Sequence, residues 1–104
     1  MVAPSRTLRA PDAVRTLLRH LHPELKKKVK ATLETILLDP SHGKALKAEL
    51  LGLRSVRIGR LRVICRITPA AVDLVAIGPR RTIYEETVRL LRRETEEQMR
   101  GSAE

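Results

Sequence analysis

Apolar and polar residues alternate along residues 53–67, and this alternation narrows the possible folds more than any other part of the sequence. Val56 and Ile58 are apolar at even positions. After Gly59 the apolar residues stand at odd positions: Leu61, Val63, Cys65 and Ile67. Alternation with a period of two is typical of a strand with one buried face, and a tight turn at Gly59 explains the change of parity. The pattern therefore predicts two antiparallel strands that share one core face.

The opposite face of this predicted hairpin is strongly basic. It carries four arginines: Arg57, Arg60, Arg62 and Arg66. No acidic residue interrupts residues 54–66, and apart from Ile64 we expect this face to form a cationic surface. Basic side chains that neutralise phosphates release counterions on binding, so such a surface favours a polyanionic partner.

Two amphipathic helices are predicted before the hairpin. The first starts at Pro11, and its apolar residues follow the i, i+3, i+4, i+7 spacing of one helix face: Val14, Leu17, Leu18 and Leu21. The second starts at Pro23, ends at the breaker residues 39–43 and has an apolar face of its own: Leu25, Val29, Leu33, Ile36 and Leu37. We expect the two to form a helix hairpin.

One more central strand and one edge strand are predicted. Residues 71–77 are apolar except for Asp73, which is typical of a central strand buried on both faces, and the glycine and proline at 78–79 end it. Residues 5–9 are interpreted as an edge strand that leads into the first helix.

A C-terminal helix is predicted from about Ile83. Thr82 and Glu85 match a capping box, in which each side chain satisfies a free backbone amide of the first helical turn. The apolar face of this helix contains Tyr84, Val88, Leu91 and, about two turns further on, Met99.

The length and composition suit one small domain. The chain has 104 residues, 42% of them hydrophobic, with one Tyr and neither Phe nor Trp. We expect a single domain over residues 1–104 with loosely ordered ends at 1–10 and 100–104. The fold class is α+β: an N-terminal helix hairpin packed on a small twisted antiparallel sheet, with a C-terminal helix. The lack of rings excludes a row of stacking platforms for single-stranded nucleic acid.

The charge balance points to an anionic partner. Lys and Arg number 21 against 12 Asp and Glu, which gives a formal net charge of +9. Nucleic acid, the ribosome or an acidic protein are therefore the candidate partners. The lysines of residues 26–30 are interpreted as a solvated helix face, with weak contact to RNA or the ribosome as the alternative.

Several other classes of site are not expected. Cys65 is the single cysteine, which excludes an internal disulfide or a CxxC site and suits a reducing compartment. The histidines His20, His22 and His42 lack metal-site spacing and are interpreted as surface residues, so we expect neither metal nor cofactor. No apolar stretch has the length of a membrane span and the N-terminus lacks an apolar secretory region, so we expect a cytoplasmic protein.

The most informative local motif is GPRRTIY at residues 78–84. It places the guanidinium groups of Arg80 and Arg81 and the phenol of Tyr84 at a helix start, where free backbone amides attract anions. Arginine binds phosphate oxygens in a bidentate manner and keeps its charge at any working pH. The motif alone fits a phosphate site and an ordinary surface turn about equally. Tyr84 alone fits a ring that packs on the helix start.

Two segments together resemble the RelE/ParE toxin superfamily: LLGLRSVRIGRLRVIC at residues 50–65 and AIGPRRTIY at residues 76–84. The resemblance covers about residues 11–91 and includes the order of the elements. It implies a bacterial or archaeal toxin of a type II toxin–antitoxin system, in which a helix hairpin packs on a twisted sheet. It also implies a cognate antitoxin that neutralises the activity. From the net charge of +9, the sheet edges and the basic face, we expect this antitoxin to be acidic and partly disordered, to fold on the toxin and to cover or displace the active surface. Its affinity should fall as salt rises.

The resemblance also implies an activity and site residues. RelE-like members cleave mRNA in the ribosomal A site without metal, by attack of a ribose 2′-hydroxyl on the adjacent phosphate. Arg62 resembles the strand arginine that grips the phosphate, Arg80 the arginine after the last strand, and Tyr84 the tyrosine of the C-terminal helix; these three are the expected catalytic residues. Four further arginines are expected to bind substrate: Arg57, which resembles a basic strand position of the family, Arg60, Arg66 and Arg81.

The chain departs from the family pattern at three positions. Pro79 stands where many members have His, Cys65 where an aromatic residue is frequent, and Gly59 where the best-known ribonuclease members have a second basic residue. Three functions remain open. The first is a ribosome-dependent mRNA endoribonuclease, the second is a ParE-like toxin that inhibits DNA gyrase by binding, and the third is a degenerate member that only binds antitoxin. The retained trio of Arg62, Arg80 and Tyr84 favours the endoribonuclease.

Overall fold

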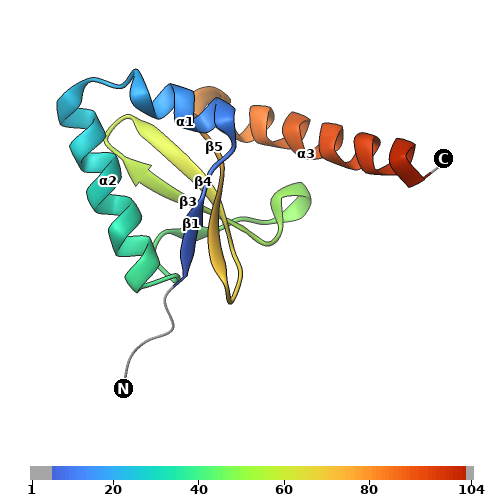
Figure 1. The fold of residues 1–104 in the computed structure, drawn as a ribbon, viewed down its shortest axis with the longest axis horizontal. Coiled ribbons are helices and arrows are strands. Elements are labelled where there is room, and N and C mark those ends of the chain that lie inside the picture. Colours follow the sequence, from blue (N-terminus) through green and yellow to red (C-terminus); the bar gives the residue numbers. More distant parts are fainter. Residues whose placement is uncertain (1–5, 103–104) are drawn as a thin grey trace.

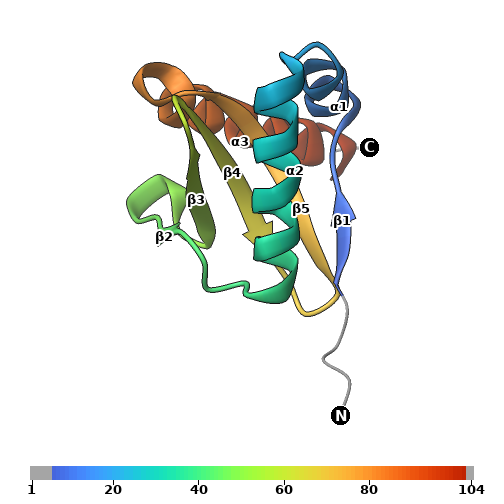
Figure 2. The ribbon, with the colours of Figure 1, turned by 90° about the vertical axis from the view of Figure 1, so that its left-hand side faces the viewer.

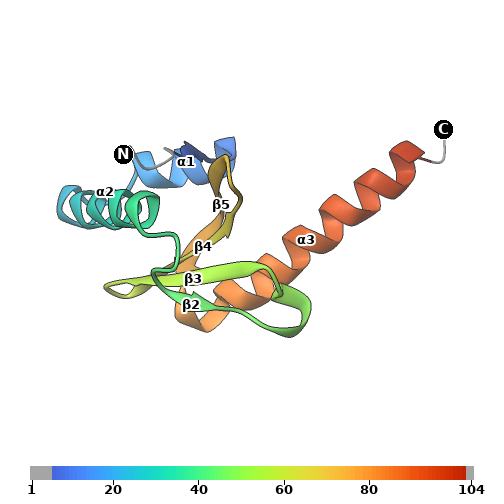
Figure 3. The same ribbon diagram turned by 90° about the horizontal axis from the view of Figure 1, so that it is seen from below.

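The computed structural model describes residues 6–102, which form a five-stranded sheet with helices on both sides (Figures 1 and 3). In chain order the elements are β1 (Thr7–Arg9), α1 (Asp12–Arg19), α2 (Pro23–Leu38), β2 (Lys44–Ala45), the 3-10 helix η1 (Ala48–Leu50), β3 (Leu53–Ile58), β4 (Leu61–Ile67), β5 (Ala71–Pro79) and α3 (Arg80–Ser102). The α+β fold class is confirmed. Parts of the expected loosely ordered ends, residues 1–5 and 103–104, lie outside the described residues.

The sheet has the strand order β1-β5-β4-β3-β2, and it is mixed rather than wholly antiparallel. Strands β2, β3, β4 and β5 pair with one another in antiparallel directions, whereas β1 pairs with β5 in parallel. The predicted edge strand is confirmed over Thr7–Arg9. An ion pair between Arg9 Nε and Asp73 Oδ1, 2.6 Å long, joins these two strands. β2 is an addition that the sequence pattern did not predict, because two residues are too few to show alternation.

The predicted strand hairpin is confirmed in its register. Arg57 lies opposite Arg62, and Ile58 opposite Leu61, so residues 59 and 60 form a two-residue turn. Gly59 has a φ of +58°, the sign that the first turn residue of a type II′ hairpin needs. Arg60 is therefore a turn residue, and its expected place on the strand face is wrong.

One face of the sheet packs against α1 and α2. Figure 2 shows α2 lying across this face. The core on this side contains Val56, Ile58, Val63, Cys65, Val72, Leu74 and Ile77 from the strands and Val14, Val29, Leu33 and Ile36 from the two helices. The core face that the alternation predicts, including a buried Cys65, is thereby confirmed.

The other face of the sheet has a second, smaller core beneath α3. It contains Leu50, Leu53, Ile64, Ala76 and Ile83, with Tyr84, Val88 and Leu91 packed at its edge. The prediction of a continuous cationic surface on this face is therefore wrong. β3 and β4 contribute apolar side chains at this face, and α3 covers them, so the arginines are confined to the hairpin end and the opposite end.

Helix α3 begins at Arg80, three residues before the predicted start. It follows β5 without a loop, so Thr82 lies within the helix instead of capping it. The second half of α3 extends beyond the sheet (Figures 1 and 3). Met99 is consequently 68% exposed, although its spacing predicts an apolar helix face.

The environment of Cys65 predicts an unreactive thiol. Cys65 is fully buried, and burial raises the pKa of its thiol from 9.0 to about 11. Because the thiolate is the nucleophile, we expect the native protein to react with Ellman's reagent at pH 8 more than about 100-fold slower than the denatured protein. The release of nitrothiobenzoate with and without guanidinium chloride measures this ratio. Since Cys65 is the only cysteine, rapid reaction of the native protein would show that the β4 register is wrong.

Candidate functional site

A small hollow at the hairpin end of the sheet gathers four of the predicted arginines. It has a volume of about 220 Å³ and is lined by Arg57, Gly59, Arg60, Leu61, Arg62 and Arg80. These residues come from the end of β3, the turn, the start of β4 and the first turn of α3. We refer to it as the arginine hollow.

The sheet register explains why residues distant in sequence meet here. Arg62 lies opposite Arg57 on one side and opposite Gly78 on the other, and directly opposed side chains share a face. Gly78 is buried, and a Cβ on it would lie 3.3 Å from Cδ1 of Ile83. The missing side chain therefore lets α3 pack close to β5, and this brings Arg80 beside Arg62.

The arginine hollow has an unbalanced positive charge. No carboxylate lines it, and within residues 6–102 none of Arg57, Arg60, Arg62 and Arg80 forms an ion pair. The first turn of α3 has no acidic residue, so its free amides add to the attraction for an anion. Like charges at short range repel, and a bound phosphate would relieve that repulsion.

Arg62 has an unused hydrogen-bond donor. Its Nε is buried and has no partner in the part of the chain that the structure describes. A buried donor without a partner costs about 1–3 kcal/mol of stability. Stability alone therefore does not explain an arginine at this position.

Tyr84 is connected to the arginine hollow through a residue that the sequence analysis missed. The hydroxyl of Tyr84 lies 3.1 Å from Oγ of Ser55, and Nη1 of Arg62 donates to the same Oγ at 3.5 Å. Tyr84 is half-buried, with its ring against the second core. The ring of Tyr84 packs on the core, while its hydroxyl joins a polar chain to Arg62, and a catalytic role for Tyr84 stays a prediction. Ser55 could have been found from its odd position in β3, because alternate residues of a strand share a face and Ser55 therefore lies on the same face as Arg57.

Two predicted substrate-binding arginines lie outside the arginine hollow. Arg66 is at the other end of β4, beside a different hollow that it lines with Arg9, Asp73 and Glu94 among others. There the hydrogen-bonded guanidinium of Arg9 holds the pKa of Asp73 below its usual range, and Arg66 adds a smaller effect. Arg81 is exposed on the first turn of α3. A role in substrate binding stays a prediction for both.

The three departures from the family pattern have different structural settings. Gly59 forms the turn, and Arg60 beside it supplies a basic group to the hollow. Pro79 is exposed at the end of β5 and directly precedes Arg80, so the chain has no imidazole there. Cys65 lies in the core on the opposite face of the sheet, away from the hollow.

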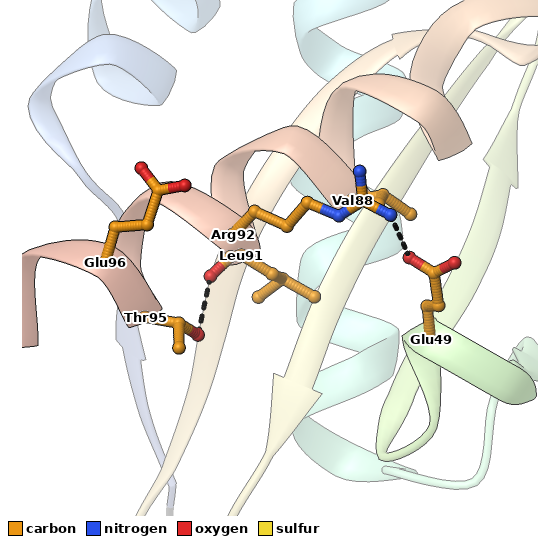
Figure 4. A pocket seen from close by; sticks show the side chains of 6 residues that line it. All are labelled: Glu49, Val88, Leu91, Arg92, Thr95 and Glu96. Carbon is orange, nitrogen blue, oxygen red and sulfur yellow. Dashed lines mark hydrogen bonds and ion pairs between the residues drawn. The ribbon is translucent and has the colours of Figure 1, made fainter. Parts of the chain in front are cut away.

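A larger hollow of about 460 Å³ lies along α3 near η1 (Figure 4). It is lined by Glu49, Val88, Leu91, Arg92, Thr95 and Glu96. Its one guanidinium, that of Arg92, is paired with Glu49 at 3.2 Å. The hydroxyl of Thr95 donates to the backbone oxygen of Leu91 at 3.0 Å. Because a carboxylate already neutralises the guanidinium of Arg92, we take the arginine hollow as the candidate site.

The described residues contain neither a metal cluster nor a membrane-spanning helix. Within residues 6–102, no group of three or more His, Cys, Asp or Glu side chains is placed to hold a metal ion. None of the helices in the same range has both the length and the apolar character needed to cross a membrane.

Comparison with known proteins agrees with this architecture. A family model for the ParE toxin of type II toxin–antitoxin systems, parDE, matches residues 7–84. The chain is similar to the Mycobacterium tuberculosis toxin–antitoxin complex RelBE2, with 28% sequence identity, a TM-score of 0.59 and coverage of 73% of this chain and 99% of that chain.

A double mutant of the Escherichia coli toxin RelE in the free state shares the fold, with 14% identity, a TM-score of 0.68 and coverage of 82% of this chain and 96% of that chain. A search of curated proteins gives no match. The family match spans both motifs and most of the sheet and helices. The chain therefore belongs to the ParE toxin family, within the RelE/ParE superfamily of type II toxin–antitoxin toxins.

Proposed function

We propose that this toxin is a ribosome-dependent mRNA endoribonuclease, with Arg62, Arg80 and Tyr84 as its catalytic residues. One observation gives the main support for this function. Four arginines without carboxylate partners surround one hollow, and one of them is linked by hydrogen bonds through Ser55 to the only phenol of the chain. An inhibitor that acts by binding alone needs an exposed basic surface but not this link.

The reaction that suits these groups is attack of a ribose 2′-oxygen on the adjacent phosphorus. The bond from the 2′-oxygen to phosphorus forms and the bond to the 5′-oxygen breaks, so a proton leaves the first oxygen and one is taken up by the second. Negative charge grows on the phosphate oxygens in the transition state, where Arg62 and Arg80 stabilise it. Tyr84 takes part in proton transfer or in orienting the substrate. Arg57 and Arg60 line the same hollow and add positive charge around the bound phosphate.

The size of the site explains why the ribosome is needed. A hollow of about 220 Å³ accommodates one phosphate group and not a length of RNA. Tyr84 is the only ring of the chain and is half-buried, so the protein offers no aromatic platform that would hold neighbouring bases. The proposal therefore assigns the alignment of the 2′-oxygen with the scissile bond to the ribosome, where codon and decoding site order the mRNA.

The proposed partner besides the ribosome is a cognate acidic antitoxin. The net charge of +9 and the arginine hollow favour an anionic chain. One of the similar structures is itself a toxin–antitoxin complex. An antitoxin that covers the hollow would block substrate and relieve the repulsion among the arginines at once.

A second candidate function is inhibition of DNA gyrase by binding. The observation that favours it is the family model, which describes ParE toxins. A degenerate member that only binds antitoxin is a third, and it would leave the arginine hollow without a substrate.

Expression of the toxin in cells and analysis of mRNA and DNA separates these functions. We expect primer extension to show new 5′ ends within translated codons. Purified, EDTA-treated toxin should cut mRNA on programmed ribosomes and leave free mRNA intact. Toxicity with intact mRNA and accumulating gyrase-linked DNA breaks would instead support the gyrase function. A chain that binds antitoxin without arresting growth would support the degenerate one.

A further inference from the structure

Ser55 is a buried polar residue whose hydroxyl has only side-chain partners. Two polar residues are buried within the described part of the chain, Ser55 and Thr87. Thr87 donates to the backbone oxygen of Ile83 at 2.7 Å, a bond within its own helix turn. The hydroxyl of Ser55, which is 1% exposed, instead lies between Tyr84 and Arg62. The buried hydroxyl therefore connects Tyr84 of α3 to Arg62 of β4.

The position of this hydroxyl is set by the sheet. Ser55 lies opposite Lys44 of β2 on one side and Ile64 of β4 on the other. Gly43 lies so close that a Cβ on it would be 2.7 Å from the backbone oxygen of Ser55. A backbone held from both sides cannot shift, so the sheet determines where Oγ meets its two partners.

The donors and acceptors of the three side chains define a direction for this hydrogen-bond chain. A guanidinium has donors only, so Arg62 Nη1 must donate and Ser55 Oγ must accept. The single proton of the serine hydroxyl is then best used by donating to the oxygen of Tyr84, because the reverse arrangement leaves that buried proton without a partner. In this arrangement the proton of Tyr84 remains free to point at the substrate.

We propose that Ser55 is a positioning residue that orients the Tyr84 hydroxyl as a proton donor and couples it to the phosphate-binding Arg62. The inference rests on the proposed function and goes beyond it, because it gives Tyr84 the role of donor. The donated proton goes to the departing 5′-oxygen as its bond to phosphorus breaks, at a site where Pro79 offers no proton. Water takes up the proton that the attacking 2′-hydroxyl releases, and water returns a proton to the Tyr84 phenolate after the reaction. Phosphate binding at Arg62 and proton donation at Tyr84 are then linked through one oxygen.

The kinetic test measures cleavage of ribosome-bound mRNA by Ser55→Ala, Tyr84→Phe and the double variant. We expect Ser55→Ala to lower kcat about 10- to 100-fold with KM within about twofold, since a displaced catalytic group costs rate rather than binding. In the Tyr84→Phe background the same change should have almost no further effect. Ser55→Thr, which restores the hydroxyl, should recover part of the loss.

The matched control removes the other buried hydroxyl. Thr87→Val has nearly the same shape and breaks the bond to Ile83. The hydroxyl of Thr87 takes no part in the hydrogen bonds of Tyr84 and Arg62 with Ser55, so kcat should stay within about twofold of wild type. An unchanged kcat in Ser55→Ala would overturn the proposal. Equal losses from Ser55→Ala with and without the Tyr84 hydroxyl would also overturn it, because they indicate a structural role.

A second measurement does not depend on cleavage. Tyr84 is the only aromatic residue, so the intrinsic fluorescence of the protein reports on Tyr84 alone. We expect inorganic phosphate to change this fluorescence in the wild type. In Ser55→Ala, calorimetry should still show phosphate binding with a Kd within about threefold, whereas the fluorescence change should fall by more than half.

The two measurements separate the inference from the proposed function. A wild-type toxin that leaves ribosomal mRNA intact but shows the Ser55-dependent fluorescence change would refute the nuclease function and support the coupling. A wild-type toxin that cleaves mRNA but shows no phosphate response, or the same response in Ser55→Ala, would refute the coupling and leave the nuclease function in place.

Discussion

Replacing Arg80 with alanine is expected to slow cleavage of ribosome-bound mRNA by about 100- to 1000-fold, and Arg62→Ala is expected to do the same. Loss of one preorganised donor at a developing oxyanion typically has this effect. Both arginines line the hollow and neither is neutralised by a carboxylate in residues 6–102, so their charge is available to the transition state. Single-turnover primer extension on programmed ribosomes measures the rate. The loss should be equal in kcat and kcat/KM.

A matched control separates this effect from the loss of one positive charge. Arg93 is exposed on α3 and does not line the arginine hollow. Arg93→Ala reduces the net charge equally and should leave the rate within about twofold, because exposed charges at a distance are screened by salt. Arg80→Lys keeps the charge but loses the bidentate geometry, so we expect an intermediate rate. Wild-type rates in folded Arg62→Ala and Arg80→Ala, checked by circular dichroism, would remove both from the catalytic site.

Replacing Ile83 with alanine is expected to lower the free energy of unfolding by about 2–5 kcal/mol, the range found for large-to-small changes at buried positions. Ile83 has no exposed surface, lies in the core beneath α3 and packs against the side-chain-free position of Gly78. Its loss opens a cavity at the point where α3 leaves the sheet. Urea unfolding followed by far-UV circular dichroism measures the change.

Met99→Ala is the matched control, because it shortens another apolar side chain of the same helix. Met99 is 68% exposed on the part of α3 that extends beyond the sheet. A surface change of this kind alters stability by no more than about 0.5 kcal/mol. Equal effects at Ile83 and Met99 would contradict the packing of α3. Because Arg80 and Tyr84 flank Ile83 on the first turns of α3, a loosened helix should also reduce activity.

The two faces of the sheet differ in composition, because only one of them adjoins the arginine hollow. The face beneath α1 and α2 holds the larger core and contains the buried thiol of Cys65. The face beneath α3 combines a small core with the arginine hollow and the Ser55 link. The reverse side of the sheet packs most of its side chains into the larger core, and this packing supports the end of the sheet at which the arginine hollow lies. A rigid site holds its charges in place before the substrate arrives, which electrostatic catalysis requires.

The sequence by itself determined the strand hairpin, the main core face and the two N-terminal helices. Each depends on local periodicity and on a nearby turn or breaker, and the positive φ of Gly59 is what a two-residue turn needs. The GPRRTIY motif also identified Arg80 and Tyr84, because a strand end followed by a helix start is visible in the chain. These features need no knowledge of distant contacts.

Only the tertiary structure decided which arginines meet and what joins them to Tyr84. Arg62 and Arg66 share a face of β4, yet four residues of strand separate them by about 13 Å, so only Arg62 reaches the hollow. The bond between Ser55 and Tyr84 spans 29 positions and exists because α3 starts directly at the end of β5 and crosses above β3. The local periodicity of a sequence does not indicate the direction in which a helix leaves a sheet. That direction depends on the packing of Ile83 against Gly78. It brings the arginines together around one hollow and places the hydroxyls of Ser55 and Tyr84 beside it.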